Sequence, residues 1–347
     1  MKTKLLLILM LSAILYSCEG NGSEENTLPT TTTGVYVLNS GSMGHNNSVL
    51  TFYEPETKQV SASVFQTANG IKLGDTANDM IIYGSKMYIA VNISNIVFIT
   101  DLKGKKIGEI KGIAPRKFAS LDGKVYVSDY NGNLVQIDTT SFETKSIKVG
   151  DKPEGIAAHN GKIYVANSGN YPTYDTKVSV IDAKTFTALS PIEVVANPQS
   201  FVIDGDNKLY LISWGDNGAA PAALQIIDTK ANTSTTIKDV VPTVASYGKE
   251  NKMYIISTTY DASWVATTKV LVFDTTTDKI IGDFISDATT IENASSITCD
   301  KITGNVYVGA SDYKTNGDMY IYSKEGKFIH KFDTEGINPM GAYFINE

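Results

Sequence analysis

The sequence predicts an all-β protein, a closed seven-bladed β-propeller, from three observations. A tyrosine flanked by hydrophobic residues recurs seven times, at intervals of 38 to 53 residues. Each repeat also contains a second hydrophobic segment that alternates with polar residues, and a period of about 45 residues with several short strands is typical of a propeller blade. The third observation is a surplus strand at the C-terminus that the first repeat lacks. The recurring tyrosines are Tyr36, Tyr88, Tyr126, Tyr164, Tyr210, Tyr254 and Tyr307.

The residues within each repeat favour strands joined by tight turns. Val, Ile, Tyr and Phe at a period of two suit a pleated, half-buried surface. Asp122-Gly123 and Asn160-Gly161 lie directly before two of the tyrosine strands, and such dipeptides between apolar runs are typical of β-hairpins. The second strand of several repeats ends in an acid followed by a turn, as in residues 270–274 and the Thr-rich segment after them. No sustained helical period is present.

The innermost strand of a blade is predicted to start at a proline. The last such step, Asn338-Pro339, is followed by a strand at residues 341–345, and there the sequence ends. The first repeat instead begins directly at residues 35–38. We therefore expect the C-terminal strand to pair beside this first strand, closing the ring and removing its open edge. The predicted domain covers residues 34–347, and the other proline steps are at Pro115, Pro153, Pro198 and Pro242.

The N-terminus predicts a lipoprotein. Residues 1–17 have a basic start and an apolar run too short to span a bilayer, which is typical of a signal peptide. Residues 15–18, Leu-Tyr-Ser-Cys, resemble a lipobox, which predicts that Cys18 is lipidated. Residues 18–33 are then predicted to be a flexible tether that begins at this lipidated cysteine. The acidic residues 23–25 resemble the export tag of Bacteroidetes surface lipoproteins, which predicts a lipid-anchored protein exposed at the outer membrane. The alternatives are an ordinary secretory signal and a generic linker.

Composition and motifs argue against nucleic-acid binding and against catalysis. The net charge is -7 and no cluster of Lys or Arg offsets it, so no nucleic-acid partner is expected. Three scattered histidines offer no metal-ligand spacing, and no nucleophile elbow or phosphate loop is present. We therefore expect no enzyme activity, no catalytic residue, no metal and no cofactor. Carboxylates recruited from distant blades, as in some lactonases, remain an alternative that spacing does not test. Cys299 is interpreted as a buried strand residue. Asp261, Asp312 and Asp318 are interpreted as solvated acids, with calcium binding on a loop as the alternative.

One face of the propeller is predicted to bind a ligand. The loops after the tyrosine strands and the loops that enter the inner strands should open on the same side of the ring. Both groups are rich in aromatic and amide side chains, which offer rigid contact area together with hydrogen-bonding groups. The loop candidates are Tyr130, Tyr171, Tyr174, Trp214, Tyr260, Trp264 and Tyr313. The candidates nearer the axis are Asn78, Asp79, Arg116, Glu154 and Gln199.

Several segments resemble known families. Residues 153–157, 164–170 and 178–182 resemble the YncE-like, surface-layer seven-bladed β-propellers. Residues 37–41 and 73–80, together with the lipobox, resemble the BtuG-type cobalamin-binding surface lipoproteins of Bacteroidetes. The second resemblance implies a corrinoid as ligand, cobalamin or a precursor, and a TonB-dependent outer-membrane transporter as partner. Two other functions stay open: a scaffold or adhesin that binds protein or glycan, and an extracellular hydrolase or lyase with carboxylates at the mouth.

Overall fold

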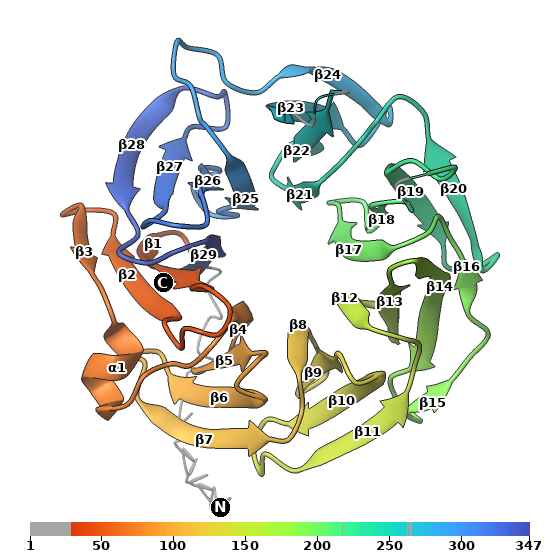
Figure 1. Cartoon of the computed structure of the whole chain (residues 1–347), viewed down its shortest axis with the longest axis horizontal. Helices are drawn as coiled ribbons and strands as arrows, with labels where there is room; N and C mark the ends of the chain where they lie inside the picture. The colour runs from red at the N-terminus through yellow and green to blue at the C-terminus, as the bar shows by residue number, and fades with distance from the viewer. Residues whose placement is uncertain (1–28, 217, 262, 264–265) are drawn as a thin grey trace, which may run out of the picture.

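The computed structural model describes residues 29–216, 218–261, 263 and 266–347. It contains seven antiparallel sheets arranged radially around a common axis (Figure 1). Each sheet is one blade, and its strands follow chain order from the axis outward, except that the innermost strand of blade 1 is the C-terminal strand. The predicted seven-bladed β-propeller is therefore confirmed. A short helix, α1 (Val64–Asn69), follows β3. Among the described residues, no helix is long and apolar enough to cross a bilayer.

The blades follow the chain order, and we number them from the N-terminus. Blade 1 contains β29 (Pro339–Asn346), β1 (Thr32–Asn39), β2 (Val49–Glu54) and β3 (Gln59–Ser61). Blade 2 contains β4 (Ala77–Tyr83), β5 (Lys86–Val91), β6 (Ile96–Asp101) and β7 (Lys106–Lys111). Blade 3 contains β8 (Pro115–Leu121), β9 (Lys124–Asp129), β10 (Asn133–Asp138) and β11 (Thr144–Lys148). Blade 4 contains β12 (Pro153–His159), β13 (Lys162–Asn170), β14 (Thr173–Asp182), β15 (Thr187–Ala188) and β16 (Ile192–Glu193).

The last three blades complete the ring. Blade 5 contains β17 (Pro198–Ile203), β18 (Leu209–Ser213), β19 (Ala223–Asp228) and β20 (Thr233–Ile237). Blade 6 contains β21 (Val244–Tyr247), β22 (Lys252–Tyr260), β23 (Ala266–Asp274) and β24 (Lys279–Asp283). Blade 7 contains β25 (Ala294–Cys299), β26 (Val306–Ala310), β27 (Asp318–Tyr322) and β28 (Phe328–Asp333).

The two ends of the domain close the ring within blade 1. Strand β29 pairs antiparallel with β1, with Val37 opposite Ala342 and Leu38 opposite Gly341. The predicted pairing of these two segments is confirmed. The backbone N–H groups of Thr30 and Thr31 also donate to the carbonyl oxygen of Glu347, at 2.8 and 3.0 Å. Strand β1 begins at Thr32, two residues before the domain boundary expected from the sequence.

Two details of the strands differ from the prediction. Inner strands β8, β12, β17 and β29 start at their prolines, but β21 starts at Val244, two residues after Pro242. Blade 4 has five strands because its outermost strand is broken into β15 and β16, which both pair with β14. Pro191 lies in the gap between them, and a proline has no N–H group to donate to a neighbouring strand.

The recurring tyrosines are buried, and three of them donate a hydrogen bond to the next blade. The hydroxyl of Tyr36 in blade 1 donates to the carbonyl of Leu102 in blade 2 (2.7 Å). Tyr210 of blade 5 donates to Asp278 Oδ1 of blade 6 (2.7 Å), and Tyr254 of blade 6 to the carbonyl of Lys324 in blade 7 (3.0 Å). These three rings therefore supply apolar area to the interface while their hydroxyls satisfy a polar group of the neighbouring outer turn. The hydroxyl of Tyr126 instead accepts from Gln136 of its own blade (3.1 Å).

Cys299 lies in β25 and is buried, as the sequence predicts. Burial raises the pKa of its thiol to about 12. A thiol with a pKa this high is protonated at neutral pH and therefore a weak nucleophile.

Candidate binding face

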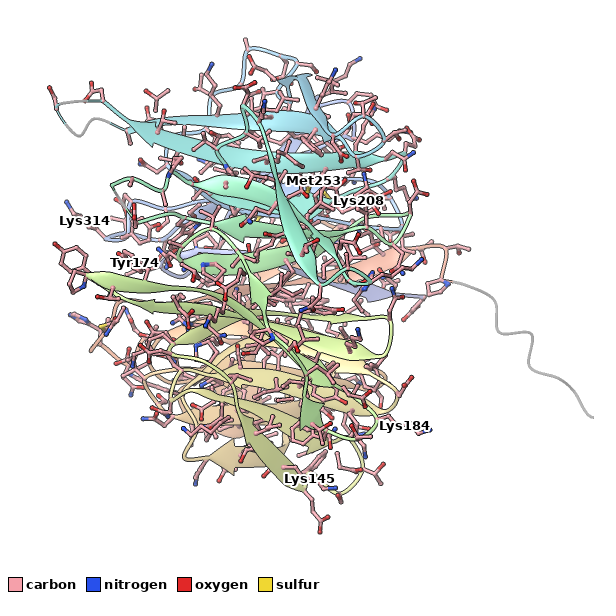
Figure 2. The ribbon with its side chains drawn as sticks, turned by 90° about the vertical axis from the view of Figure 1, so that its right-hand side faces the viewer. Lys145, Tyr174, Lys184, Lys208, Met253 and Lys314 are labelled. Carbon is pink, nitrogen blue, oxygen red and sulfur yellow. The ribbon has the colours of Figure 1, made fainter. Side chains whose placement is uncertain are left out.

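The two groups of loops open on the same side of the ring, as predicted. The backbone N–H of Tyr130, just after β9, donates to the carbonyl of Ala114 before β8 (2.8 Å). Ser168 and Trp214 make the equivalent bonds to Lys152 and to Asn197, at 3.1 and 2.9 Å. We call this side the loop face. In Figure 2, Tyr174 and Lys314 lie on the loop face, and Lys184 lies on the opposite side.

The inner strands begin with bulges at the loop face. Six of the seven inner strands shift register near their first residue, all except β21. A bulge leaves one or two residues without a ladder partner and re-aims their side chains. Four of the five predicted axial residues are bulge residues: Asn78, Arg116, Glu154 and Gln199. The backbone therefore gives these side chains a common position near the axis.

Arg116 of blade 3 and Glu154 of blade 4 form a salt bridge. Arg116 Nε donates to Glu154 Oε2 (2.8 Å) and Nη2 donates to Oε1 (2.7 Å). The side chain of Glu154 is 9% exposed and that of Arg116 is 24% exposed. The ring of Tyr130 lies 4.9 Å from the guanidinium and 4.7 Å from Lys152 Nζ. Burial, and next the charge of Glu154, raises the pKa of the Tyr130 hydroxyl, so it remains a neutral hydrogen-bonding group at neutral pH.

Asp79 connects three inner strands. Its Oδ2 accepts from the backbone N–H of Phe118 (2.8 Å) and its Oδ1 from the hydroxyl of Tyr343 (2.9 Å). Burial, and next the charge of Asp79, raises the pKa of Tyr343 far above its ordinary range. Lys117 Nζ lies 3.9 Å from Asp79 Oδ1 and donates to the carbonyl of Asn78 (3.1 Å). These contacts link blades 1, 2 and 3, so Asp79 and Tyr343 hold inner strands together.

The charged groups nearest the axis are therefore already paired. Glu154 accepts from Arg116, and Asp79 accepts from Tyr343 and lies 3.9 Å from Lys117 Nζ. Within the described ranges, no group of three or more His, Cys, Asp and Glu side chains is placed to hold a metal ion. Gln199 donates to the side chain of its neighbour Asn197.

The predicted aromatic residues are spread over the loop face. Tyr171 is 77% exposed and packs edge-to-face against Tyr174, with their ring centroids 6.5 Å apart. Trp214 is 48% exposed, and its Nε1 donates to the carbonyl of Thr243 in the next blade (2.9 Å). Tyr313 is 62% exposed, and its backbone is left-handed with φ 61°. Tyr260 is the last residue of β22, and Trp264, like Cys18, lies outside the described residues.

The structure thus brings together some of the predicted residues and separates others. Arg116 contacts Glu154 and Tyr130, and the adjacent Lys117 contacts Asn78 and Asp79, so these residues form one cluster along the start of β8. Tyr171, Trp214 and Tyr313 instead lie on blades 4, 5 and 7. Sequence reasoning missed Lys117, Lys152 and Tyr343, which complete that cluster. Lys117 follows Arg116, and Lys152 lies two residues before Glu154 beside the same proline. The repeated proline segments could therefore have predicted that these two lysines lie near the axis.

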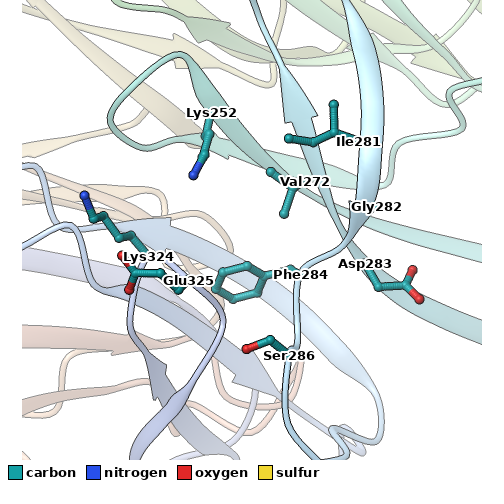
Figure 3. A pocket seen from close by; sticks show the side chains of 9 residues that line it. All are labelled: Lys252, Val272, Ile281, Gly282, Asp283, Phe284, Ser286, Lys324 and Glu325. Atoms are coloured by element: carbon teal, nitrogen blue, oxygen red, sulfur yellow. The ribbon is translucent and has the colours of Figure 1, made fainter.

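Two hollows occur elsewhere, and none of the predicted residues lines them. One, of about 400 Å³, lies on the loop face of blade 7. The other, of about 210 Å³, lies near the outer turns of blades 6 and 7, where Figure 3 shows Phe284 between Val272 and the Lys324-Glu325 turn. Lys324 there pairs with Glu250.

Comparisons with known proteins agree with the fold. Residues 33–342 match the family described as domain of unknown function (DUF5074). The chain belongs to that family. No curated protein sequence matches it. The structure of this DUF5074 domain is also similar to several solved structures. Their sequence identities to this chain are low, so the similarity shows the fold alone.

Three of those structures illustrate the similarity in fold. A quinoprotein alcohol dehydrogenase-like protein from Bacteroides thetaiotaomicron has a TM-score of 0.65 and 18% identity, covering 90% of this chain and 78% of its own. Hydrazine synthase from Kuenenia stuttgartiensis has a TM-score of 0.62 and 18% identity, with 74% and 85% covered. Apo AztD from Citrobacter koseri has a TM-score of 0.57 and 11% identity, with 91% and 99% covered.

Proposed function

We propose that this DUF5074 propeller is a surface lipoprotein that binds a corrinoid on its loop face without converting it, and passes the ligand to a TonB-dependent outer-membrane transporter. The observation that supports this proposal best is the composition of the loop face. Exposed rings of Tyr171, Trp214 and Tyr313 lie on the loop face of blades 4, 5 and 7, and hydrogen-bonding side chains lie nearer the axis on the same face. Tyrosine and tryptophan are enriched at binding surfaces, because their rings combine apolar contact area with a polar group.

The chemistry of a corrinoid matches such a face. A corrinoid is a broad macrocycle fringed with amide groups, so its recognition needs apolar contact area and many hydrogen-bond partners around it. Tyrosine and tryptophan rings provide the contact area, and their polar atoms orient the ligand. The paired state of Arg116 and Glu154 means that this cluster offers donors and acceptors with little net charge, which suits a largely neutral ligand. The resemblance of the first repeat to BtuG-type lipoproteins supports the same ligand class.

The binding proposal is tested with purified residues 29–347 and cyanocobalamin by titration calorimetry. Trp214→Ala should weaken binding by roughly thirtyfold, because an aromatic side chain that the bound ligand covers contributes about 2 kcal/mol to the binding free energy. The matched control is Phe328→Ala, since Phe328 is a comparably exposed ring (42%) in outer strand β28. That substitution should leave the affinity within twofold of the original value.

Two results would reject the corrinoid assignment. The first is the absence of heat at a ligand concentration on the order of 100 µM, because surface capture at lower affinity would not retain the ligand. The second is an equal loss of affinity in both variants, which would place the ligand away from the loop face. A neighbouring gene for a TonB-dependent transporter, and co-purification of the two proteins from solubilised membranes, would test the proposed transfer.

A further inference from the structure

The hollow on the loop face of blade 7 is bounded by two loops. One is the segment before β25, and the other is the connection between β26 and β27. The backbone N–H of Ser311 in the second loop donates to the carbonyl of Asn293 in the first (3.1 Å), so the loops are joined at the base of the hollow. Its volume is about 400 Å³. The lining includes Thr290, Glu292, Asp312, Thr315, Asn316 and Tyr320.

The second loop is held in shape by its own side chains. Asp312 Oδ1 accepts from the backbone N–H groups of Lys314 and Thr315, both at 2.8 Å. The hydroxyl of Thr315 donates to Asp312 Oδ2 (3.0 Å), and the N–H of Tyr313 donates to the hydroxyl of Ser311 (3.0 Å). A loop ordered in this way loses little conformational entropy when a ligand binds.

The wall of the hollow offers both donors and acceptors. Glu292 and Asp312 supply carboxylate oxygens, and hydrogen bonds from the backbone lower the pKa of Asp312, which keeps it ionised at neutral pH. Asn316 and Thr290 each supply a donor and an acceptor. Lys331 pairs with Asp318 (2.7 Å) and lies 5.0 Å from the centroid of the Tyr320 ring, which forms an apolar part of the wall. The carboxylates of Glu292, Asp312 and Asp318 and the ammonium of Lys331 give the wall a net charge of -2, so anionic ligands are disfavoured.

We propose that this hollow binds a neutral saccharide. Each hydroxyl of a pyranose is at once a donor and an acceptor, and it pairs best with a wall that combines carboxylate, amide and hydroxyl groups. The site is independent of the axial cluster, because the two share no residue, and it does not rest on corrinoid binding.

The test is a screen of residues 29–347 for saturation transfer from protein to the methyl glycosides of glucose, galactose, mannose, N-acetylglucosamine and glucuronic acid. We expect signals from at least one neutral glycoside and a weaker signal from the glucuronide. Glu292→Gln and Asn316→Ala should each weaken the best ligand by about tenfold, the effect of losing one strong hydrogen bond. Both side chains are exposed, so neither change should alter folding.

The matched control is Tyr171→Ala, which removes an exposed ring from the same face in blade 4 and should leave saccharide binding within twofold. No transfer to any neutral glycoside, or equal binding by the protein and both hollow variants, would overturn the proposal. Loss of binding on addition of a chelator would also overturn it, because a bound cation would then hold the sugar in place of these side chains.

Discussion

Removing Arg116 alone should destabilise the propeller more than replacing the whole Arg116–Glu154 pair. Removing one partner of a fully buried ion pair costs about 3–5 kcal/mol, because the remaining charge is left without a counter-ion. Arg116→Leu leaves Glu154, which is only 9% exposed, so we expect a loss of about 3 kcal/mol in the free energy of unfolding. Glu154→Leu leaves Arg116, which is 24% exposed and contacts the ring of Tyr130, so we expect about 2 kcal/mol.

The double variant distinguishes pairing from simple loss of packing. With both charges gone, no unpaired ion remains, and we expect a loss of about 2 kcal/mol, compared with about 5 kcal/mol for the sum of the single changes. The coupling between the two sites is then about 3 kcal/mol. Urea unfolding followed by circular dichroism measures all four proteins, after reversibility has been checked. A double variant whose loss equals the sum of the single losses would refute the reasoning.

Three further predictions address closure, pH dependence and localisation. Deleting residues 338–347 removes β29 and exposes the edge of β1, so the truncated protein should aggregate or unfold at lower urea concentration in light scattering and unfolding assays; a monomer of unchanged stability would contradict this. Burial raises the pKa of Tyr36 and of Tyr88 to about 12, above the value of about 10 in an unfolded chain, so stability should be constant below pH 10 and fall as the pH rises through 12. Tyr36→Phe should reduce that loss of stability at alkaline pH. If the free energy of unfolding falls with pH equally steeply in this variant, Tyr36 does not contribute to the pH dependence. Cys18→Ala should release the protein from membranes in cell fractionation, and retention of the variant in cells that lack the proposed transporter would show that lipidation is not the anchor.

The candidate site shows why its residues could be predicted only in part. The proline steps place Arg116, Glu154 and Gln199 at the start of inner strands, and that local regularity is visible in the sequence. Which of these residues touch depends on the bulges at the loop face, which let one side chain reach the next blade. The hollow of blade 7 was not predicted at all, because Glu292, Asn316 and Lys331 come from three segments that carry no shared motif.

The sequence by itself determined the seven blades, the face on which the tyrosine-strand loops open, and the closure of the ring by the C-terminal strand. These features depend on short-range periodicity and on turn residues, which act within one repeat. Only the tertiary structure decided that the hydroxyl of Tyr36 reaches the outer turn of the next blade, that Tyr343 binds Asp79, and that a polar hollow forms beside Tyr320. Each of these depends on how neighbouring blades pack, and the distance between side chains on different blades is set by the whole ring and not by any one segment.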